Sequence, residues 1–360
     1  MMSNKRLQQV FKKLVENHID YLLITDAHSI DYLLGIMIHP GERFLGLLLS
    51  ANQSSTLVLN RLFRLNREID IDQIWYFDTE DSMQLVSSLI KQSNVVIGVD
   101  KVLPARFLLP FMQYLPNAKF VNGSMIVDKI RMVKEEAEIE KMKQASTIND
   151  LAIDEVIHLI KEGCSEHDIA EQLPSIYRKY GSEGVSFEPI IAFGANAADG
   201  HHSVDNTVIK SGDSIVIDMG CIYQGYCSDM TRTVFYQEVS NKARVVYELV
   251  KKANQAAIAM IKPGVLLSDI DKCARDIISE AGYGENFNHR LGHFIGREVH
   301  EYGDVSSQFN IAVEEGMIFS IEPGIYIQGE FGVRIEDLVI VTKDGCKSLN
   351  TYPKDIIVIK

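Results

Sequence analysis

The sequence lacks both a hydrophobic segment long enough to cross a membrane and an excess of basic residues. No run in it approaches the roughly 18 apolar residues that mark a membrane-spanning helix. Its start, MMSNKRLQQVFKKLVENH, is typical of an amphipathic helix, and we expect no export signal there. Lysine and arginine number 36 against 49 aspartate and glutamate residues, a net charge of −13. We therefore expect no membrane partner and no nucleic-acid partner, since the latter needs an electropositive surface.

Cysteine is also scarce. No two of the five cysteines form a C-x-x-C pair, and their number is odd. A disulfide framework or a thiolate zinc site is therefore not expected. Cys221 and Cys227 flank a predicted turn and could form a disulfide, but reduced thiols in a cytoplasmic protein are the favoured interpretation.

The length of 360 residues predicts two domains. The first third alternates buried strands with helices, which predicts a mixed α/β domain over residues 1–125. From residue 129 an amphipathic helix is expected, with apolar residues at spacings of three and four as far as Val156. A second domain is expected over 126–360. Residues 1–128 carry 12 basic and 13 acidic side chains, so nearly all of the acidic excess lies in the second domain.

The second domain contains an internal duplication. The segment IKEGCSEHDI at 160–169 is similar to IKPGVLLSDI at 261–270, and each is followed by a pair of apolar strands. Ser165 with Asp168, and Ser268 with Asp271, fit the first and fourth positions of a capped helix. Each copy is therefore predicted to consist of two helices followed by two strands joined by a turn.

Each copy also places an acidic residue on both arms of its strand pair. These residues are Asp218 and Asp229 in the first copy, and Glu322 and Glu336 in the second. Burying four unpaired carboxylates together is prohibitively costly, so they must be protonated, paired with arginine or bound to cations. Oxygen-rich sites favour hard or borderline divalent metals. Four acids on two related hairpins suggest a pair of metal ions.

The order of the motifs resembles that of the pita-bread metallopeptidases, which include methionine aminopeptidase, aminopeptidase P and prolidase. The motifs are IDMG with CSDMTRT, then HRLGHFIGREVHE, SIEPGIY and GVRIED. The resemblance to bacterial Xaa-Pro dipeptidases (prolidases) extends over essentially the whole chain. It implies an α+β protein with a C-terminal pita-bread domain of pseudo-twofold symmetry, preceded by a smaller α/β domain that supports a homodimer.

The resemblance also implies five metal ligands. Asp218 would bind one metal, His293 and Glu322 the other, and Asp229 and Glu336 would bridge both. Members of the family hold a water or hydroxide between the two ions, which lower its pKa. Manganese is the expected metal, although cobalt and zinc tolerate the same ligands.

Three further residues are assigned by the same resemblance. His201 would bind substrate or steady the oxyanion, His300 would approach the scissile carbonyl, and Arg334 would contact the substrate carboxylate. Glu322 would also carry a proton to the leaving nitrogen. From the residues alone, Arg334 could instead pair with a nearby acid such as Asp337.

The sequence departs from the family pattern at two positions. Gly200 stands where the family usually has proline, which leaves the roles of His201 and His202 ambiguous. Phe294 stands in the middle of a usual G-H-G-x-G motif, where it could crowd the proline pocket or be strained. In the first domain, HPGERFLGL at 39–47 resembles a loop of lactic-type prolidases that reaches the partner's active site. A solvated loop is the slightly favoured interpretation of His39, Glu42 and Arg43.

Hydrolysis of Xaa-Pro dipeptides by two metal ions is therefore the leading prediction, with a short proline-containing peptide as the substrate. Aminopeptidase P activity on longer Xaa-Pro peptides is the nearest alternative. A metal-independent creatinase-like hydrolase or a non-catalytic binding protein is disfavoured, because all five ligand positions are retained.

Overall fold

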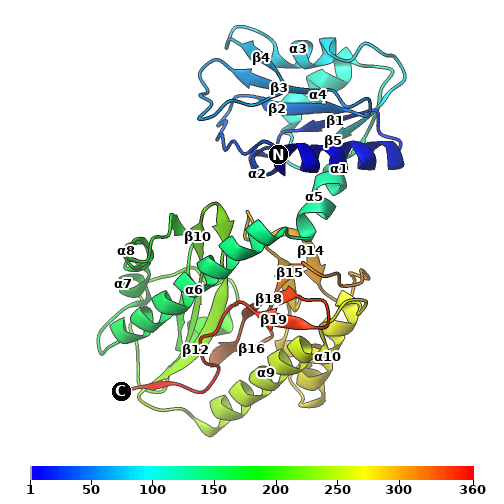
Figure 1. The fold of residues 1–360 in the computed structure, drawn as a ribbon. Helices are drawn as coiled ribbons and strands as arrows, with labels where there is room; N and C mark the ends of the chain where they lie inside the picture. Colours follow the sequence, from blue (N-terminus) through cyan, green and yellow to red (C-terminus); the bar gives the residue numbers. More distant parts are fainter. Residues whose placement is uncertain (1) are drawn as a thin grey trace. The chain divides into compact units, whose positions relative to one another are not determined.

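The computed structural model describes residues 2–360 and divides the chain into two compact units (Figure 1). The first unit ends at Arg131, and the second begins at Met132. Helix α5 (Ser124–Met132) crosses this division, and its residues Ile126 and Val127 lie in an apolar core of the first unit. The units therefore divide slightly beyond the predicted boundary at 125/126, because most of α5 packs with the first unit.

The first unit is a six-stranded sheet with helices on both faces. Its strand order is β4-β3-β2-β1-β5-β6, antiparallel along β3-β2-β1 and parallel elsewhere. Successive residues of the strands enter alternate apolar cores; α1, α2 and α5 contribute to one core, and α3 and α4 to the other. The strands are β1 (Tyr21–Ile24), β2 (Leu45–Ser50), β3 (Ser55–Asn60), β4 (Asp72–Tyr76), β5 (Val96–Val99) and β6 (Lys119–Asn122), and the helices are α1 (Met2–Glu16), α2 (Ala27–Leu34), α3 (Ser82–Ser88) and α4 (Ala105–Tyr114). The expected mixed α/β architecture is confirmed.

The long helix expected from residue 129 is interrupted. Helix α5 ends at Met132, and α6 (Glu136–Leu159) begins after a short extended segment. In that segment the Lys134 amide donates to the Gly316 carbonyl at 2.9 Å, and Val133 forms a β-bridge with Met317. The apolar periodicity does not reveal this break, although Glu135 and Glu138 form a capping box at the start of α6.

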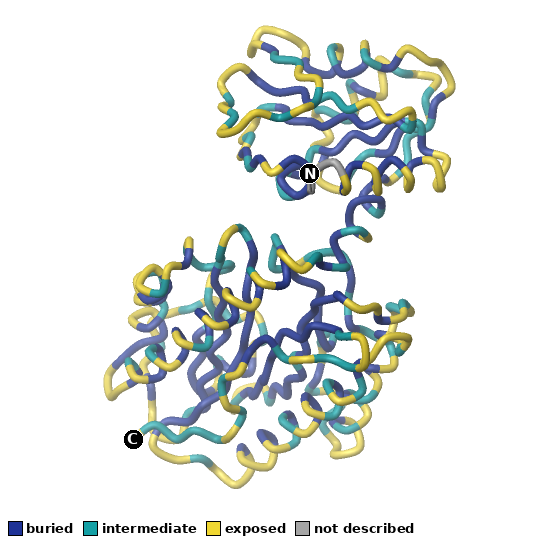
Figure 2. The backbone as a smooth tube through the Cα atoms, viewed as in Figure 1, coloured by how far each residue is buried: buried dark blue, intermediate teal, exposed yellow. Residues whose placement is uncertain are grey.

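The second unit places several small sheets between long helices. The main sheets have the orders β20-β12-β9-β8 and β14-β13-β15-β18-β19. Figure 2 shows that the central strands are buried, whereas the helices expose part of their surface. The remaining bounds are α7 (Glu166–Ala170), α8 (Leu173–Lys179), β7 (Gly184–Val185), β8 (Ile190–Phe193), η1 (Gly194–Ala198), β9 (Ser214–Met219), β10 (Cys221–Tyr223), β11 (Tyr226–Cys227), β12 (Met230–Tyr236), α9 (Asn241–Met260), α10 (Leu267–Glu280), η2 (Gly284–Asn286), β13 (Gly292–Phe294), β14 (Glu301–Val305), β15 (Ile318–Ile321), β16 (Gly324–Ile327), β17 (Phe331–Arg334), β18 (Asp337–Val341), β19 (Cys346–Ser348) and β20 (Val358–Ile359).

The predicted duplication is visible in the backbone pairing of this unit. Strands β9 and β12 pair antiparallel in the first copy, as β15 and β18 do in the second. At the start of the shorter helix of each copy, the Glu166 amide donates to the Thr207 carbonyl at 3.1 Å, and the Leu267 amide donates to the Ile311 carbonyl at 3.0 Å. Glu166 and Leu267 therefore occupy equivalent positions.

The two predicted helix caps differ in outcome. Ser165 and Asp168 form a capping box at the start of α7, as expected. The expected Ser268–Asp271 cap is wrong, because Ser268 lies inside α10, whose N-cap residue is Leu266. Asp271 is instead buried, where its carboxylate accepts from Arg275 and from the Leu291 amide.

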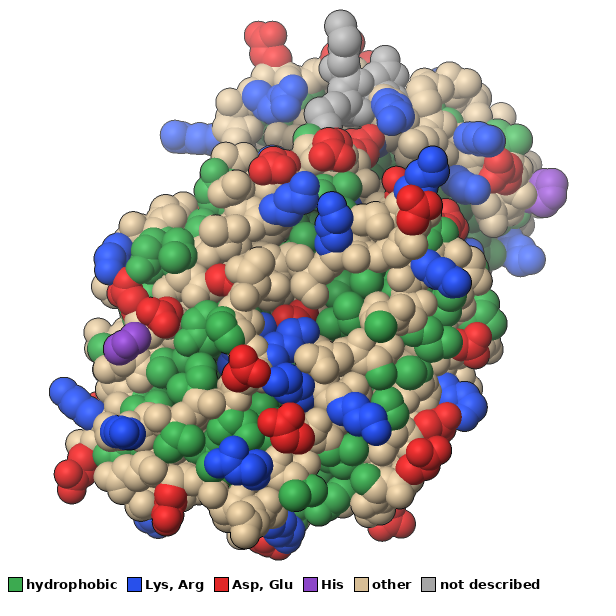
Figure 3. Space-filling model, turned by 60° about the horizontal axis from the view of Figure 1, so that its bottom comes forward, with side chains coloured by type: hydrophobic (Ala, Val, Ile, Leu, Met, Phe, Trp, Pro, Cys, Tyr) green, Lys and Arg blue, Asp and Glu red, His purple; other side chains and the backbone are tan. Residues whose placement is uncertain are grey.

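The surface of the protein carries both signs of charge. On the face shown in Figure 3, acidic and basic side chains are interspersed with hydrophobic ones, and neither sign dominates. Among the described residues, no helix is long and apolar enough to span a membrane. All five cysteines are free thiols, and the possible Cys221–Cys227 disulfide is not formed.

Candidate metal centre

The five predicted ligands lie at strand ends or in short connections beside strands. Asp218 is on β9, Asp229 immediately precedes β12, His293 is on β13, Glu322 follows β15, and Glu336 immediately precedes β18. The chain places them in the interior, with Glu336 only 1% exposed. Two hydrogen-bonded links hold the hairpins side by side: the Glu336 amide donates to the Thr231 carbonyl, and the Thr233 hydroxyl donates to the Arg334 carbonyl.

These side chains converge. His293 Nε2 lies 3.5 Å from Asp229 Oδ2 and 3.4 Å from Glu322 Oε1. One ligand atom from each of Asp229, His293 and Glu336 lies within 4.8 Å of the other two. The structure therefore brings together residues that are more than 100 positions apart in the sequence, as the duplicated hairpins predict.

Burial opposes charge on several of these groups. It raises the pKa of Asp229 and Glu336 well above the ordinary carboxyl value, and the neighbouring acids raise it further. Burial also raises the pKa of Glu322 and lowers that of His293. Without a cation, burial therefore favours the protonated form of these carboxyls and the neutral form of the imidazole. A divalent cation would instead favour the ionised carboxylates and a neutral imidazole that can bind it.

The hydrogen bonding of the acids leaves room for such a cation. Asp218 Oδ1, Asp229 Oδ1 and Glu336 Oε1 are all buried and accept no hydrogen bond from any described residue. Buried polar atoms are nearly always satisfied, so three such oxygens beside an imidazole require an explanation. Carboxylate oxygens and an imidazole nitrogen are a suitable donor set for manganese, cobalt or zinc. The residues present therefore fit the metal centre that the family resemblance implies.

Arg334 lies against this cluster and is itself buried. Its Nη2 donates to Asp218 Oδ2 at 2.6 Å, and its Nε donates to the Thr231 hydroxyl at 3.0 Å. Its Nη1 donates to the Gly200 carbonyl at 3.1 Å and to the Tyr326 hydroxyl at 2.9 Å. Arg334 thus pairs with a nearby acid, as the local alternative allowed, although the acid is Asp218 and not Asp337.

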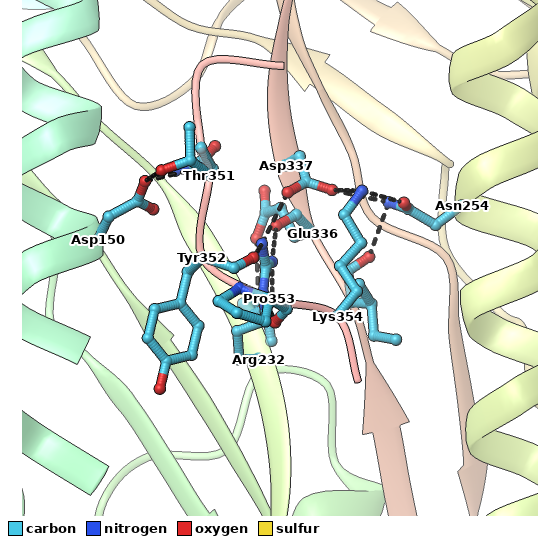
Figure 4. Close-up of polar contacts among 12 residues, drawn as sticks. Asp150, Arg232, Asn254, Glu336, Asp337, Thr351, Tyr352, Pro353 and Lys354 are labelled. Carbon is cyan, nitrogen blue, oxygen red and sulfur yellow. Dashed lines mark hydrogen bonds and ion pairs between the residues drawn. The ribbon is translucent and has the colours of Figure 1, made fainter. Parts of the chain in front are cut away.

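Glu336 is fixed from two sides. Its Oε2 accepts from the Thr231 hydroxyl at 2.7 Å. Behind it, Arg232 Nη1 donates to the Glu336 carbonyl at 2.6 Å, and Arg232 Nη2 donates to Asp337 at 2.8 Å (Figure 4). Figure 4 also shows Lys354 and Asn254 reaching the other side of Asp337, so the start of β18, directly after Glu336, is held by a buried polar network.

The three histidines near the cluster have different surroundings. His201 is exposed, whereas the ring of His202 points to Glu166, with 2.7 Å between Nε2 and Oε2. This separates the two adjacent histidines that the sequence left ambiguous. The ring of His300 is exposed on one side and packs edge-on against His293, with 4.3 Å between the ring centroids. Burial and the charges of His293, Arg290 and His201 lower the pKa of His300 to about 4.

Neither departure from the family pattern disturbs the cluster. Phe294 is fully buried in the apolar core, 5.4 Å from the Phe319 ring centroid, and its φ is not positive. The concern about strain at Phe294 is therefore wrong, because its φ is not positive. That Phe294 crowds the proline pocket stays a prediction. The Gly200 carbonyl accepts a hydrogen bond from Arg334 at 3.1 Å, and the looser loop expected from glycine at this position stays a prediction.

In the first unit, His39 and Glu42 are exposed. Arg43 donates to both carboxylate oxygens of Asp78, at 2.9 and 3.0 Å, and to Glu42 at 2.7 Å. The guanidinium group is thus engaged within its own unit. That this loop reaches a partner's active site stays a prediction.

The sequence did not assign roles to Thr231, Tyr326 and Ser320. Thr231 connects Glu336 with Arg334, and Tyr326 connects Arg334 with His289 at 3.0 Å. The Ser320 hydroxyl accepts from the His293 amide and donates to Glu322. All three residues lie inside the quoted motifs, which was the only available signal for them.

Comparison with known proteins agrees with this geometry. Residues 140–343 match the model of metallopeptidase family M24, and residues 6–133 match the Creatinase/Prolidase N-terminal domain. An uncharacterized peptidase of Staphylococcus saprophyticus is 37% identical, over 97% of this chain and 100% of the relative.

Two solved structures are also similar over nearly their whole length. A prolidase from Pyrococcus horikoshii is 32% identical with a TM-score of 0.90, over 98% of this chain and 100% of that one. An X-Pro aminopeptidase from Thermotoga maritima is 33% identical with a TM-score of 0.82, over 97% of this chain and 99% of that one. The expected pita-bread architecture is thereby confirmed, and the chain belongs to metallopeptidase family M24.

Proposed function

We propose that this protein hydrolyses Xaa-Pro dipeptides with two divalent metal ions held by Asp218, Asp229, His293, Glu322 and Glu336. The observation that carries the proposal is the set of three buried carboxylate oxygens that accept no hydrogen bond from the described residues, beside the His293 imidazole. The prolidase of Pyrococcus horikoshii, similar over almost the whole chain, supports the choice of substrate.

When bound, the metals would supply an activated water nucleophile near neutral pH and polarise the scissile carbonyl. The protein's own groups account for the rest of the proposed mechanism. His201 and His300 present exposed imidazoles that can donate hydrogen bonds to a developing oxyanion. The Ser320 hydroxyl holds the Glu322 carboxylate at 3.0 Å, which orients it to carry a proton to the leaving nitrogen.

Arg334 has a different role in this proposal from the one that the family resemblance implies. Its donors are already directed to Asp218, Thr231, Gly200 and Tyr326. We infer that Arg334 orients the Asp218 carboxylate and does not bind the substrate carboxylate with its guanidinium group.

An Xaa-Pro bond needs a dedicated enzyme, because its nitrogen carries no hydrogen and the proline ring fixes φ. Aminopeptidase P activity is the second candidate, favoured by the similarity to the X-Pro aminopeptidase of Thermotoga maritima. An assay that compares Xaa-Pro with Xaa-Pro-Xaa peptides, with and without added manganese, separates the two. Faster metal-dependent cleavage of the dipeptide is expected, whereas cleavage of only the tripeptide would establish the alternative. No metal-dependent cleavage of either would contradict the proposal.

We also propose a homodimer in the cytoplasm, supported by the Creatinase/Prolidase N-terminal domain and the free thiols. Light scattering at micromolar concentration should give twice the monomer mass of 40.5 kDa. If the dimer forms, Arg43→Ala tests the predicted loop. A rise in KM with an unchanged mass would place that loop at the partner's site, and no change would assign it to the solvated surface.

A further inference from the structure

Glu166, the first residue of α7, is completely buried and lies outside the candidate metal centre. Four donors converge on its carboxylate. Oε1 accepts from the Phe193 amide at 2.8 Å and from Asn196 Nδ2 at 3.0 Å. Oε2 accepts from the His202 ring at 2.7 Å and from the Asp205 amide at 3.1 Å. All four donors belong to residues 193–205, the segment that contains His201.

The backbone plan does not require an acid at this position. The equivalent residue of the second copy is Leu267, which is fully buried in an apolar core. Ile311 and Phe309, which by the same register correspond to Thr207 and Asp205, pack against that core. The second copy therefore fills with apolar side chains the space in which the first copy assembles Glu166 and its donors. The Glu166 carboxylate is therefore not needed for the backbone fold that the two copies share.

The cluster of Glu166, His202 and Asp205 is not explained by a cation. Their ligand atoms lie close enough to hold one. However, both Glu166 oxygens already accept hydrogen bonds from N–H groups, two of them backbone amides that cannot turn away. These contacts make Glu166 the anchor of the segment.

Two contacts from the opposite side complete the anchoring. Gln328 Nε2 donates to the Ala198 carbonyl at 2.8 Å, and Arg334 Nη1 donates to the Gly200 carbonyl at 3.1 Å. His201 is thus held on its N-terminal side by Gln328 and Arg334, and on its C-terminal side by the His202–Glu166 contact. Its own side chain stays exposed.

We propose that Glu166 and His202 are positioning residues that hold the His201 imidazole in its working place. The role given to His201 rests on the proposed function. The anchoring of residues 193–205 by Glu166 does not depend on it. A rigid anchor at this point would supply the restraint that a proline at position 200 would otherwise give. Displacing a substrate-contacting group by about 1 Å can cost on the order of a hundredfold in rate.

The first test compares His202→Ala with His202→Gln, which can still donate to Glu166. We expect His202→Ala to lower kcat by about tenfold to a hundredfold, with a much smaller change in KM, and His202→Gln to recover most of it. His167→Ala is the matched control. His167 lies on α7, next to Glu166, but its ring is exposed and contacts Glu171 at 3.1 Å. This substitution should leave kcat unchanged.

A double substitution then decides whether His202 acts through its neighbour. In a His201→Ala background, His202→Ala should cause no further loss of kcat. An equal loss in both backgrounds would overturn the proposal, because His202 would then serve the fold and not His201. An unaffected kcat in His201→Ala alone would overturn it as well.

Amide hydrogen exchange supplies a readout that needs no substrate. His202→Ala should speed exchange across residues 193–205 and leave the strands β9 and β12 protected. Glu166→Gln should have the larger effect on the same segment, because it removes one acceptor oxygen. Unchanged exchange in both variants would overturn the anchoring. If the exchange changes as expected but the wild-type protein cleaves no Xaa-Pro substrate, the anchoring stands and the proposed function fails.

Discussion

The two copies within the second unit share a backbone plan but neutralise their acids differently. In the first copy, Asp218 is paired with Arg334, a cation that comes from the second copy. In the second copy, Glu322 and Glu336 accept from the hydroxyls of Ser320 and Thr231. The first hairpin therefore depends on a charge from its counterpart, whereas the acids of the second hairpin contact uncharged hydroxyls and the His293 ring.

This difference shows what the duplication provides and what it does not. The backbone fold that the two copies share provides two strand pairs, and these bring the acids together in the candidate metal centre. The polar residues that differ between the copies, such as Glu166 in place of a leucine, determine how the surrounding loops are held. Symmetry thus explains how the acids of the candidate metal centre come together, and departures from symmetry explain how the neighbouring loops are held.

The largest expected effect comes from removing an acid that both proposed metals share. Asp229→Asn keeps the shape of the side chain but removes its charge, so turnover should fall to background and bound metal should fall below two ions per chain. Elemental analysis of metal-saturated protein and a dipeptide assay measure both. Asp269→Asn, at an exposed position of α10, is the control and should change neither. Full turnover in Asp229→Asn would show that the ligand assignment is wrong.

The metal cluster was predictable because its residues stand in motifs with fixed spacing. The partner of Asp218 was not, because Arg334 lies 116 residues away and several acids compete for it. The Glu166–His202 contact was equally hidden, since a glutamate after a helix cap usually faces solvent.

The fold shows the same limit. Apolar runs at 20–25, 44–49, 55–60 and 95–100 predict strands and correspond to β1, β2, β3 and β5, whereas no such run marks the polar strands β4 and β6 or the short helix α2. The break between α5 and α6 coincides with the pairing of Lys134 with Gly316 and with the capping box that Glu135 and Glu138 form at the start of α6. The local sequence therefore predicts that a helix forms in this region, but the break within it is seen only in the folded structure.

The dependence of the first hairpin on Arg334 predicts a loss of stability. Arg334→Met leaves Asp218 without its buried partner, which should lower the free energy of unfolding by about 3–5 kcal/mol in metal-free protein. Arg290→Met is the control, because Arg290 pairs with Asp304 at a partly exposed site and should cost less than about 1 kcal/mol. Adding Asp218→Asn to Arg334→Met should recover part of the loss in urea unfolding. A further loss would mean that Arg334 is not needed to neutralise Asp218.

The exposed histidines should affect the chemical step and not the fold. Alanine at His201 or His300 should lower turnover by roughly a hundredfold, as removal of one oxyanion donor does. Metal content and Tm should stay near those of the wild type, because both residues are exposed. Steady-state kinetics with calorimetry check this. A large drop in Tm without a change in kcat would place these histidines in the fold.

The smallest expected effect is a pH-dependent gain of stability from metal. Burial raises the pKa of Asp229, Glu322 and Glu336 in the folded protein without metal. Between the ordinary carboxyl pKa and these raised values, the folded state binds more protons than the unfolded state. The metal-free protein should therefore lose stability as the pH rises through that window.

Metal reverses this trend, because it binds the ionised carboxylates of the folded state only. At a metal concentration of about 100 Kd the gain is about 2.7 kcal/mol, or roughly 5–10 °C in Tm for a unit of this size. We expect the increase in Tm on adding manganese to be larger at pH 8 than at pH 5, where protons compete for the same oxygens. In Asp229→Asn the dependence on pH should be weaker, because one of the titrating acids is gone. An equal increase at both pH values would mean that the buried acids are not the groups that take up the metal.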